Sequence, residues 1–494
     1  MNLKIIKRVL LSIFFIFILL AIDCIKSPTL SADFHTKEST NSFLNLNGVM
    51  WYYNTWFGNK YSDIKNDLAN LQDNGINIIA FFCPYDGDKN EYDGCDPLDW
   101  YNVPPQCGTM QDFKNLTAAA HARGMKVICY FVNIYIDSSS SFFHTAEQQY
   151  ATGNRSAKEC ATFHWTTNSE DPFPSNGTFG AGTRQGFEDR WIYSSTAGAY
   201  YASIWNEAAL DFNIQGAHYT SIDIEHFWLD AGMDGFMFDV ARCEPIMKKL
   251  WITIPKTYTA TDKWLCPEVS NITRAQNYYD YGFTCWFNYA DNDQLNDYGR
   301  IINGNINADE LELALANSDW AHRRNCWTYA WSIWHDDVAN LDHSEPYPTY
   351  SNDDVMRVQE AALLAGAGIT YGCGMYDQYL TWSSTLKTNW GKVLKTVNSN
   401  PSLLPSASRI RLATGNQTTY AMIRTSMDGS QTALLIYNFN DAPTNVTVNL
   451  SGSGINADQI PIDLYNGGNG PVITSLNYTV SLPAYGFKML GVSM

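Results

Sequence analysis

The stretch DAGMDGFMFDVARCEP, residues 230–245, holds the most informative pattern in the chain. It predicts the end of a helix, a turn, a short apolar strand from Gly235 to Phe238, and then Asp239. An acidic residue directly after a buried parallel strand stands at the carboxyl end of that strand, where (β/α) barrels place their reactive groups. Asp239 is therefore the first candidate catalytic residue.

A second strand with an acid at its end follows about 30 residues later, which is roughly the length of one βα repeat. This segment, WLCPEVS (residues 264–270), places Glu268 directly after an apolar run. Two carboxyl groups on neighbouring strands are the minimum set for acid–base and nucleophilic attack on a glycosidic bond. Asp239 and Glu268 together therefore predict a site at the carboxyl edge of a sheet.

Strand-like and helix-like segments alternate on both sides of these two strands. Eight short apolar runs predict strands with both faces buried, at residues 49–54, 77–82, 126–132, 234–238, 263–267, 282–289, 326–333 and 368–372. Helical patterns occur at residues 62–75, 110–124, 219–232, 244–254, 353–366 and 385–398. The alternation predicts an α/β fold, a closed (β/α)8 TIM barrel over residues 45–403.

Two regions depart from this alternation. Residues 136–215, after the third strand, are rich in Ser, Gly, Asn, Thr and aromatic residues, and the segment is too long for an ordinary loop. We expect a small inserted domain there. After residue 404, apolar and polar residues alternate between Gly, Asn and Asp turns, which predicts a C-terminal antiparallel β-sandwich over residues 404–494.

The N-terminus predicts export. Lys4, Lys7 and Arg8 precede an apolar run of 14 residues, VLLSIFFIFILLAI, which has the size of a signal-peptide core and is short for a membrane span. We expect a signal peptide and spacer within residues 1–30, a secreted mature chain and no membrane span in it; a signal anchor is the alternative. Removal of residues 1–30 changes the net charge from −18 to about −21. This acidity disfavours nucleic acid and anionic membranes as partners.

The sequons and cysteines agree with an exported chain. Cys95 and Cys107 share one loop and are the best disulfide candidates, whereas Cys83, Cys129 and Cys266 lie in apolar runs and are expected to be buried thiols. The Asn-x-Ser/Thr sequence that accepts N-linked glycans occurs at Asn115, Asn154, Asn176, Asn271, Asn416, Asn445, Asn449 and Asn477.

From residue 45 to the end, the chain resembles the α-amylase family, glycoside hydrolase family 13. GMDGFMFDV matches the motif around the family's nucleophile, so the resemblance assigns that function to Asp239. WLCPEVS matches the acid/base motif and assigns it to Glu268. SIWHDD matches the paired His-Asp motif, so His335 is implied to bind substrate and Asp336 to grip sugar hydroxyls in the transition state.

Weaker matches imply further substrate-binding residues. EYDGCDPLDWYNVPPQCGT resembles the segment that carries a stacking tyrosine, here Tyr92, and ALDFN resembles the motif that closes the inserted domain, here with Asp211. Arg242 stands in the place of the lysine of the family's Lys-His pair. Tyr135 stands in the place of a histidine that contacts the sugar, and could stack or donate instead.

Two departures from the family stand out. The family carries an arginine two residues before the nucleophile, where it orients that carboxylate; this chain has Met237. The family's first motif is also replaced, with Tyr130, Ile134 and Tyr135 at its three characteristic positions, and the asparagine lost there is a usual calcium ligand.

The resemblance implies a secreted retaining glycoside hydrolase that cleaves α-glucosidic bonds through a covalent glycosyl-enzyme intermediate. The alternative is a catalytically weak or inactive α-amylase-like protein that binds carbohydrate or a protein partner. We expect a monomer acting on an α-glucan or another carbohydrate, with no required cofactor. Calcium binding by an oxygen-ligand loop is one interpretation of DGDKNEYD, and a solvated acidic loop is the other; the ligands would be Asp86, Asp88, Asn90 and Asp93.

Overall fold

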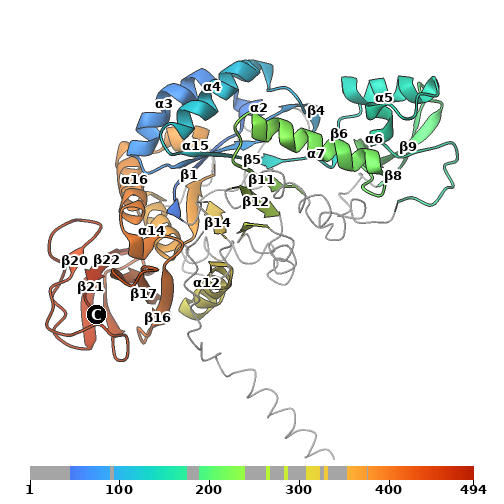
Figure 1. Cartoon of the computed structure of the whole chain (residues 1–494). Helices are drawn as coiled ribbons and strands as arrows, with labels where there is room; N and C mark the ends of the chain where they lie inside the picture. The colour runs from blue at the N-terminus through green and yellow to red at the C-terminus, as the bar shows by residue number, and fades with distance from the viewer. Residues whose placement is uncertain are drawn as a thin grey trace, which may run out of the picture. The chain divides into compact units, whose positions relative to one another are not determined.

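A computed structural model of the chain describes residues 45–88, 94–174, 189–239, 263–267, 283–287, 307–322, 327–331, 353–374 and 376–494 (Figure 1). All of these residues belong to one structural unit. The predicted signal peptide lies outside the described residues, and no helix among those described is long and apolar enough to cross a membrane.

Eight parallel strands form the central sheet, in the order β12-β11-β5-β2-β1-β15-β14-β13. Neighbours in this order are consecutive in the chain order of these strands, except for β1 and β15, the first and the last of them, which pair with each other. The strands are β1 (Val49–Tyr52), β2 (Ile78–Phe82), β5 (Lys126–Phe131), β11 (Gly235–Phe238), β12 (Trp264–Pro267), β13 (Cys285–Phe287), β14 (Trp327–Trp331) and β15 (Thr370–Cys373).

The two ends of this sheet meet. The Thr284 N–H beside β13 donates to the Leu265 carbonyl of β12 at 3.2 Å, and the Leu265 N–H donates to Thr284 Oγ1 at 3.0 Å. The sheet therefore closes into a barrel, which confirms the fold predicted from the sequence. Each strand falls within one of the eight predicted apolar runs or extends one residue beyond it, because only residues that tolerate burial on both faces fit a parallel sheet covered by helices.

Helices follow most of the barrel strands. Five of the predicted helices are present: α3 (Tyr61–Asp73), α4 (Met110–His121), α7 (Gln215–Asp230), α14 (Asp353–Gly366) and α16 (Ser384–Asn398). Helix α4 begins with a capping box, in which Thr109 accepts from the Asp112 N–H and Asp112 accepts from the Thr109 N–H. Helix α12 (Ala308–His322) was not predicted, and the helix predicted at 244–254 lies outside the described residues.

An antiparallel sheet occupies the long segment between β5 and α7. Its strands are β6 (Tyr135–Ile136), β7 (Trp165–Thr166), β8 (Arg190–Ser194), β9 (Ala199–Ile204) and β10 (Glu207–Ala209), accompanied by helices α5 (Ser141–Ala151) and α6 (Lys158–Thr162). Phe143 lies at the centre of this region. Its ring packs edge-on against Phe163 at 5.1 Å and Tyr201 at 4.6 Å, and it stacks on Trp165. These aromatic residues fill a small hydrophobic core.

The C-terminal strands form two antiparallel sheets (Figure 1). One contains β16 (Ser408–Leu412), β17 (Thr419–Thr425), β18 (Thr432–Asn438), β20 (Ile462–Asp463) and β22 (Phe487–Val492), and the other contains β19 (Thr444–Asn449) and β21 (Asn477–Leu482). A buried cluster joins both sheets, with Leu434 and Ile436 from the first and Val446 and Val448 from the second. The predicted β-sandwich is therefore confirmed.

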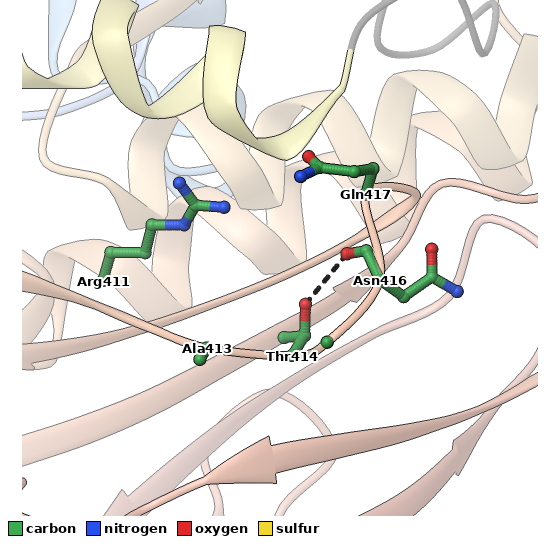
Figure 2. Close-up of a pocket in the computed structure, with 6 residues that line it drawn as sticks. Arg411, Ala413, Thr414, Asn416 and Gln417 are labelled. Carbon is green, nitrogen blue, oxygen red and sulfur yellow. Dashed lines mark hydrogen bonds between the residues drawn. The ribbon is translucent and has the colours of Figure 1, made fainter.

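A surface pocket of about 270 Å³ lies at the turn between β16 and β17 (Figure 2). Arg411, Asn416 and Gln417 line it, and the Thr414 hydroxyl donates to the Asn416 carbonyl at 3.1 Å. The pocket is open and is formed by one short segment of the sandwich. None of its lining residues belongs to the barrel.

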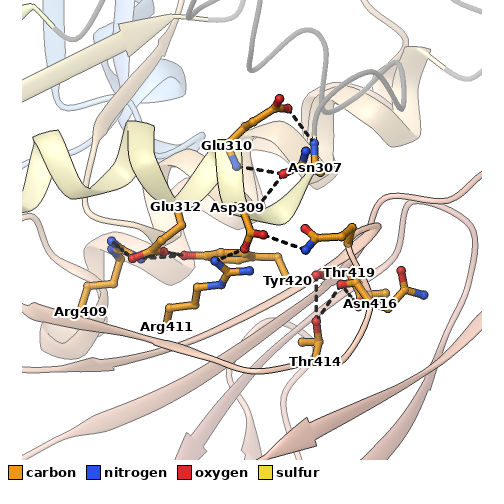
Figure 3. A network of polar contacts seen from close by, with 11 residues as sticks. Asn307, Asp309, Glu310, Glu312, Arg409, Arg411, Thr414, Asn416, Thr419 and Tyr420 are labelled. Carbon is orange, nitrogen blue, oxygen red and sulfur yellow. Dashed lines mark hydrogen bonds and ion pairs between the residues drawn. The ribbon is translucent and has the colours of Figure 1, made fainter. Parts of the chain in front are cut away.

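Ion pairs join α12 of the barrel to the sandwich (Figure 3). Arg409 on β16 is buried and pairs with Glu312 at 2.6 Å and Asp319 at 2.6 Å. Burial alone would lower the pKa of Arg409, but Tyr420, Glu312 and Asp319 together raise it above its usual value. Arg411 pairs with Asp309 at 2.6 Å in a far more exposed position.

The structure overturns the predicted disulfide between Cys95 and Cys107. The loop after β2 folds back through β3 (Asp86–Gly87) and β4 (Pro97–Asp99), and this brings Cys95 Sγ to 3.0 Å from Cys83 Sγ. Cys107 lies elsewhere, with its thiol 3.2 Å from the Asn54 carbonyl. As predicted, Cys83, Cys129 and Cys266 are buried thiols.

Candidate active site

Asp239 follows β11 directly, at the carboxyl end of the strand. Strand β11 lies between β5 and β12, and its four residues Gly-Phe-Met-Phe are all buried. The Asp239 N–H donates to the Phe131 carbonyl at 3.1 Å, so the ladder continues one residue beyond the strand and fixes the backbone of this aspartate. Its side chain is mostly buried, with 8% of the residue exposed.

Tyr130 contacts this carboxylate. Its hydroxyl donates a hydrogen bond to Oδ1 of Asp239. Tyr130 belongs to β5, where it is the register partner of Met237 on β11. The sequence identified Tyr130 only as a replacement in the family's first motif; the hydrogen bond depends on the register of two strands that lie more than a hundred residues apart in the chain.

An aromatic stack holds the Tyr130 ring. Phe82 at the end of β2 is its register partner on the other side, and the two rings stack at 4.7 Å with 15° between their planes. Tyr53, the residue after β1, stacks on Phe82 at 4.5 Å. All three residues are buried. The Tyr53–Phe82–Tyr130 stack thus crosses three neighbouring strands of the barrel and limits the positions that the Tyr130 hydroxyl can take.

The predicted acid/base residue follows the neighbouring strand in sequence. Strand β12 ends at Pro267, whose register partner is Phe238, the residue before Asp239. Glu268 comes next in the chain but lies outside the described residues. Four other predicted site residues also lie outside them: Tyr92, Arg242, His335 and Asp336.

Tyr135 is the predicted substrate-binding residue that the structure places near Asp239. Burial raises the pKa of the Tyr135 hydroxyl well above its usual value, and the charges of Asp96 and Asp239 raise it further. The residue is 1% exposed, and its ring packs edge-on against Trp205 at 5.7 Å. Binding of a sugar by Tyr135 stays a prediction.

Asp211 is occupied by contacts within the protein. One carboxylate oxygen accepts from the Asn213 N–H at 2.9 Å and from the Asn213 side-chain amide at 3.0 Å, and the other pairs with His164 Nδ1 at 2.6 Å. These bonds close the turn that leads into α7. Asp211 is fully buried, and its predicted contact with substrate is not tested by this arrangement.

The proposed calcium loop is only partly described. Asp86 faces Asp99 across the β3–β4 pair, and burial followed by the charge of Asp99 raises the pKa of Asp86. The Asp88 N–H donates to the Asp96 carbonyl at 2.9 Å. Asn90 and Asp93 lie outside the described residues, and the part of the chain that is described contains no cluster of three acidic, His or Cys side chains suited to a metal. Calcium binding stays a prediction.

A second aspartate lies at the opposite end of β11 and has a structural environment. Asp234 accepts from His121 Nε2 at 2.8 Å, from Lys126 Nζ at 3.3 Å and from the Val127 N–H at 2.8 Å. Burial alone would raise the pKa of Asp234, but these partners lower it below the ordinary value of 3.8. The amino end of the strand is thereby anchored, while the carboxyl end carries Asp239.

Comparison with known proteins shows which family the chain resembles. The family model described as "Alpha amylase, catalytic domain" matches residues 40–269, a range that includes Asp239 and Glu268. A second, "Maltogenic Amylase, C-terminal domain", matches residues 411–489 in the sandwich. Over these two ranges the chain is similar to the α-amylase family.

Relatives within the α-amylase family match the chain only in part. Alpha-amylase 3 of Dictyoglomus thermophilum is 28% identical over 192 residues, which cover 38% of this chain and 34% of that protein. The oligo-1,6-glucosidase of Halalkalibacterium halodurans is 28% identical over 182 residues, 36% of this chain and 30% of that enzyme. The match thus spans about a third of each of these relatives.

Solved structures of the α-amylase family match nearly the whole chain. The α-amylase from Geobacillus thermoleovorans, complexed with acarbose, superimposes with a TM-score of 0.67 over 92% of this chain and 99% of that chain, at 14% identity. The Anoxybacillus α-amylase gives a TM-score of 0.69 with 92% and 99% coverage, at 15% identity. Likeness at this identity supports the fold, while function has to be argued from the site.

Proposed function

We propose that this protein is a secreted retaining glycoside hydrolase of the α-amylase family that cleaves α-glucosidic bonds in oligo- or polysaccharides. The observation that carries the proposal is the position of Asp239, held by the backbone ladder and by Tyr130 at the carboxyl end of a barrel strand. Glu268 is the residue after the neighbouring strand in sequence, and the family match includes both acids.

In this mechanism Asp239 attacks the anomeric carbon while Glu268 donates a proton to the departing glycosidic oxygen. The C–O bond to the leaving group breaks as the bond to the Asp239 carboxylate forms. Glu268, now ionised, then takes a proton from water, and the resulting attack releases the sugar with its original anomeric configuration. Retention requires the two carboxyl groups to lie about 5–5.5 Å apart. His335 and Asp336 would hydrogen-bond sugar hydroxyls as positive charge develops on the ring.

One observation favours a second candidate function. Met237 occupies the place of the family's arginine and is completely buried, so no cation stands at that position. An arginine there would orient the carboxylate and favour its ionised form, and Met237 does neither. The second candidate is therefore a catalytically weak or inactive carbohydrate-binding protein.

The two functions are distinguished by assaying the purified mature protein on α-glucosides, malto-oligosaccharides and sucrose. A hydrolase turns over at least one of them, and proton NMR shows that the α-anomer of the product forms first. Asp239→Asn is the control and is expected to abolish turnover while the melting temperature stays within a few degrees. If no substrate gives turnover that depends on Asp239, while wild type still binds malto-oligosaccharides, the second function replaces the first.

Secretion and glycosylation belong to the same proposal. Six sequon asparagines lie among the described residues and all are exposed, as attachment of a glycan requires: Asn115, Asn154, Asn416, Asn445, Asn449 and Asn477. N-terminal sequencing of protein exported by a eukaryotic host should show cleavage near residue 30. Recovery of the uncleaved chain in the membrane fraction would instead support a signal anchor.

A further inference from the structure

We infer that Tyr130 is a positioning residue of the nucleophile and that its hydroxyl, which donates from the neighbouring strand, takes over the orienting function of the arginine that Met237 replaces. The inference rests on the proposed function of Asp239 as the nucleophile. It goes beyond that proposal because it assigns the support of this carboxylate to Tyr130, a residue that replaces a characteristic residue of the family's first motif.

The strand register makes this exchange possible. A side chain at position 237 can reach Asp239 along its own strand, because residues two apart in a strand point to the same face. Tyr130 is the register partner of Met237 on β5, so it stands beside that position and reaches the same carboxylate from the side. The hydrogen bond to Asp239 Oδ1 shows that the tyrosine side chain is long enough to do so.

The surroundings hold the donor in one place. The Tyr130 ring stacks on Phe82, which in turn stacks on Tyr53, and all three are buried. A ring packed in this way loses little further freedom when its hydroxyl bonds the carboxylate. The donor is therefore preorganised, which is the property that a residue orienting a nucleophile needs.

The exchange also changes the charge at the site. An arginine brings a permanent positive charge and up to two parallel hydrogen bonds, whereas the tyrosine hydroxyl is neutral and donates one. A hydrogen bond to a carboxylate favours its charged form over its protonated form. Tyr130 therefore orients Asp239 and favours its ionisation, but less strongly than an arginine would.

Tyr130→Phe tests the inference, because it removes the hydroxyl and keeps the stacked ring. We expect kcat to fall about 10- to 100-fold, as for loss of a hydrogen bond to a charged group, with KM changed by less than about 2-fold. The acid limb of the kcat/KM profile should move to higher pH. The melting temperature should stay close to that of wild type, since the ring packing is retained.

Tyr52→Phe is the matched control. Tyr52 is also a buried tyrosine of the barrel, on β1, and its hydroxyl has no hydrogen-bond partner among the described residues. Its removal should leave kcat, KM and the pH profile unchanged. An equal loss in both variants, or a Tyr130→Phe enzyme with wild-type kcat and pH profile, would overturn the assignment.

Crystal structures of wild type and Tyr130→Phe separate this inference from the proposed function. We expect one orientation of the Asp239 carboxylate in wild type and a rotated or split carboxylate in the variant. An unchanged, fully ordered carboxylate in Tyr130→Phe refutes the positioning function whether or not the protein turns over substrate. Absence of Asp239-dependent turnover in wild type refutes the proposed hydrolase instead.

Discussion

At the scale of single residues, the two aspartates at the ends of β11 show how the surroundings of a carboxylate determine its function. Asp234 and Asp239 flank the same four-residue strand. Asp234 receives hydrogen bonds from His121, Lys126 and the Val127 backbone, whereas Asp239 is bonded by the neutral Tyr130 hydroxyl. The first set of contacts fits an anchor of the barrel, whereas the Tyr130 contact orients a carboxylate at the end of the strand where barrel folds place their reactive groups.

Asparagine substitutions at the two positions should therefore have opposite effects. Asp234→Asn removes the buried carboxylate that pairs with the partly exposed side chains of His121 and Lys126, so we expect a loss of roughly 1–3 kcal/mol in the free energy of unfolding. Turnover per folded molecule should be retained. Asp239→Asn should abolish turnover with little change in stability. Urea titration measures the stability of both variants, and activity assays measure their turnover. A loss of turnover in Asp234→Asn with normal stability would contradict the expected difference.

The contribution of Asp234 to stability depends on pH, and the direction of this dependence follows from its pKa. The pKa of Asp234 is lowered in the folded state, so its contribution to stability is fully present above the ordinary value of 3.8 and is lost as the pH falls below that value and through the lowered pKa of the folded state. In Asp234→Asn this part of the acid-induced loss of stability should disappear.

The contribution of Glu225 on α7 to stability should change with pH in the direction opposite to that of Asp234. It is fully buried, accepts from Asn133 Nδ2 at 2.7 Å and from the Ser221 hydroxyl at 3.2 Å, and burial raises its pKa well above 4.5 despite these bonds. The folded state therefore keeps this proton while the unfolded chain releases it, so stability falls as the pH rises above about 4.5.

Glu225→Gln removes this titration and keeps the shape of the side chain. Relative to wild type, the variant should gain stability as the pH rises from 4 to 8, with the smallest difference at the acid end. Melting temperatures measured across this range test the expectation. A difference that does not change with pH would show that Glu225 is ionised in the folded protein.

At the scale of secondary-structure elements, the loop after β2 gives a test for the cysteines. Its fold-back brings the thiols of Cys83 and Cys95 together and leaves Cys107 beside Asn54. With oxidised glutathione as oxidant, two thiols form one disulfide and the glutathione is reduced to two thiols. Peptide mapping without reduction should then recover a Cys83–Cys95 link. A Cys95–Cys107 link would contradict the described loop, and Cys107→Ser should leave the expected link intact.

The elements differ in how far the sequence predicted them, for physical reasons. Barrel strands such as Ile78–Phe82 are buried on both faces and produce continuous apolar runs that the sequence reveals directly. Helix α12, ADELELALANSDWAH, was missed because Leu313, on its exposed side, interrupts the separation of polar and apolar faces. The Cys83–Cys95 contact was missed because spacing does not reveal how a loop folds back.

The candidate site was predicted only in part for a related reason. Asp239 was identified because a strand end is a local pattern, and the register of β11 with β12 agrees with the placement of Glu268 directly after a strand. The link between Tyr130 and Asp239 arises from tertiary pairing of strands. No local pattern in the sequence contains both residues.

At the scale of the whole molecule, two buried arginines of the sandwich bind groups of the barrel. Arg409 of β16 binds Glu312 and Asp319 of α12 with its side chain 2% exposed. Arg424 of β17 is buried as well and donates to the Ala367 carbonyl at 2.8 Å, and burial lowers its pKa to about 10. The two domains therefore share polar contacts that neither could satisfy alone.

Arg409→Ala should weaken this junction strongly, since it leaves two carboxylates at the interface without their partner. We expect a loss of about 3–5 kcal/mol in the free energy of unfolding, or separate unfolding of the sandwich. Arg411→Ala removes a more exposed pair and should cost about 0–1 kcal/mol. Urea unfolding and limited proteolysis compare the variants, and equal losses would show that burial does not govern this interface.

The Tyr53–Phe82–Tyr130 stack has a consequence for how such proteins are recognised and engineered. A sequence search that demands an arginine two residues before the nucleophile discards chains in which the support comes from the adjacent strand. In this chain positions 130 and 237 are register partners, so substitutions at the two have to be chosen together. A tyrosine at the first and an uncharged residue at the second is a testable signature of glycosidases whose nucleophile is supported from the neighbouring strand.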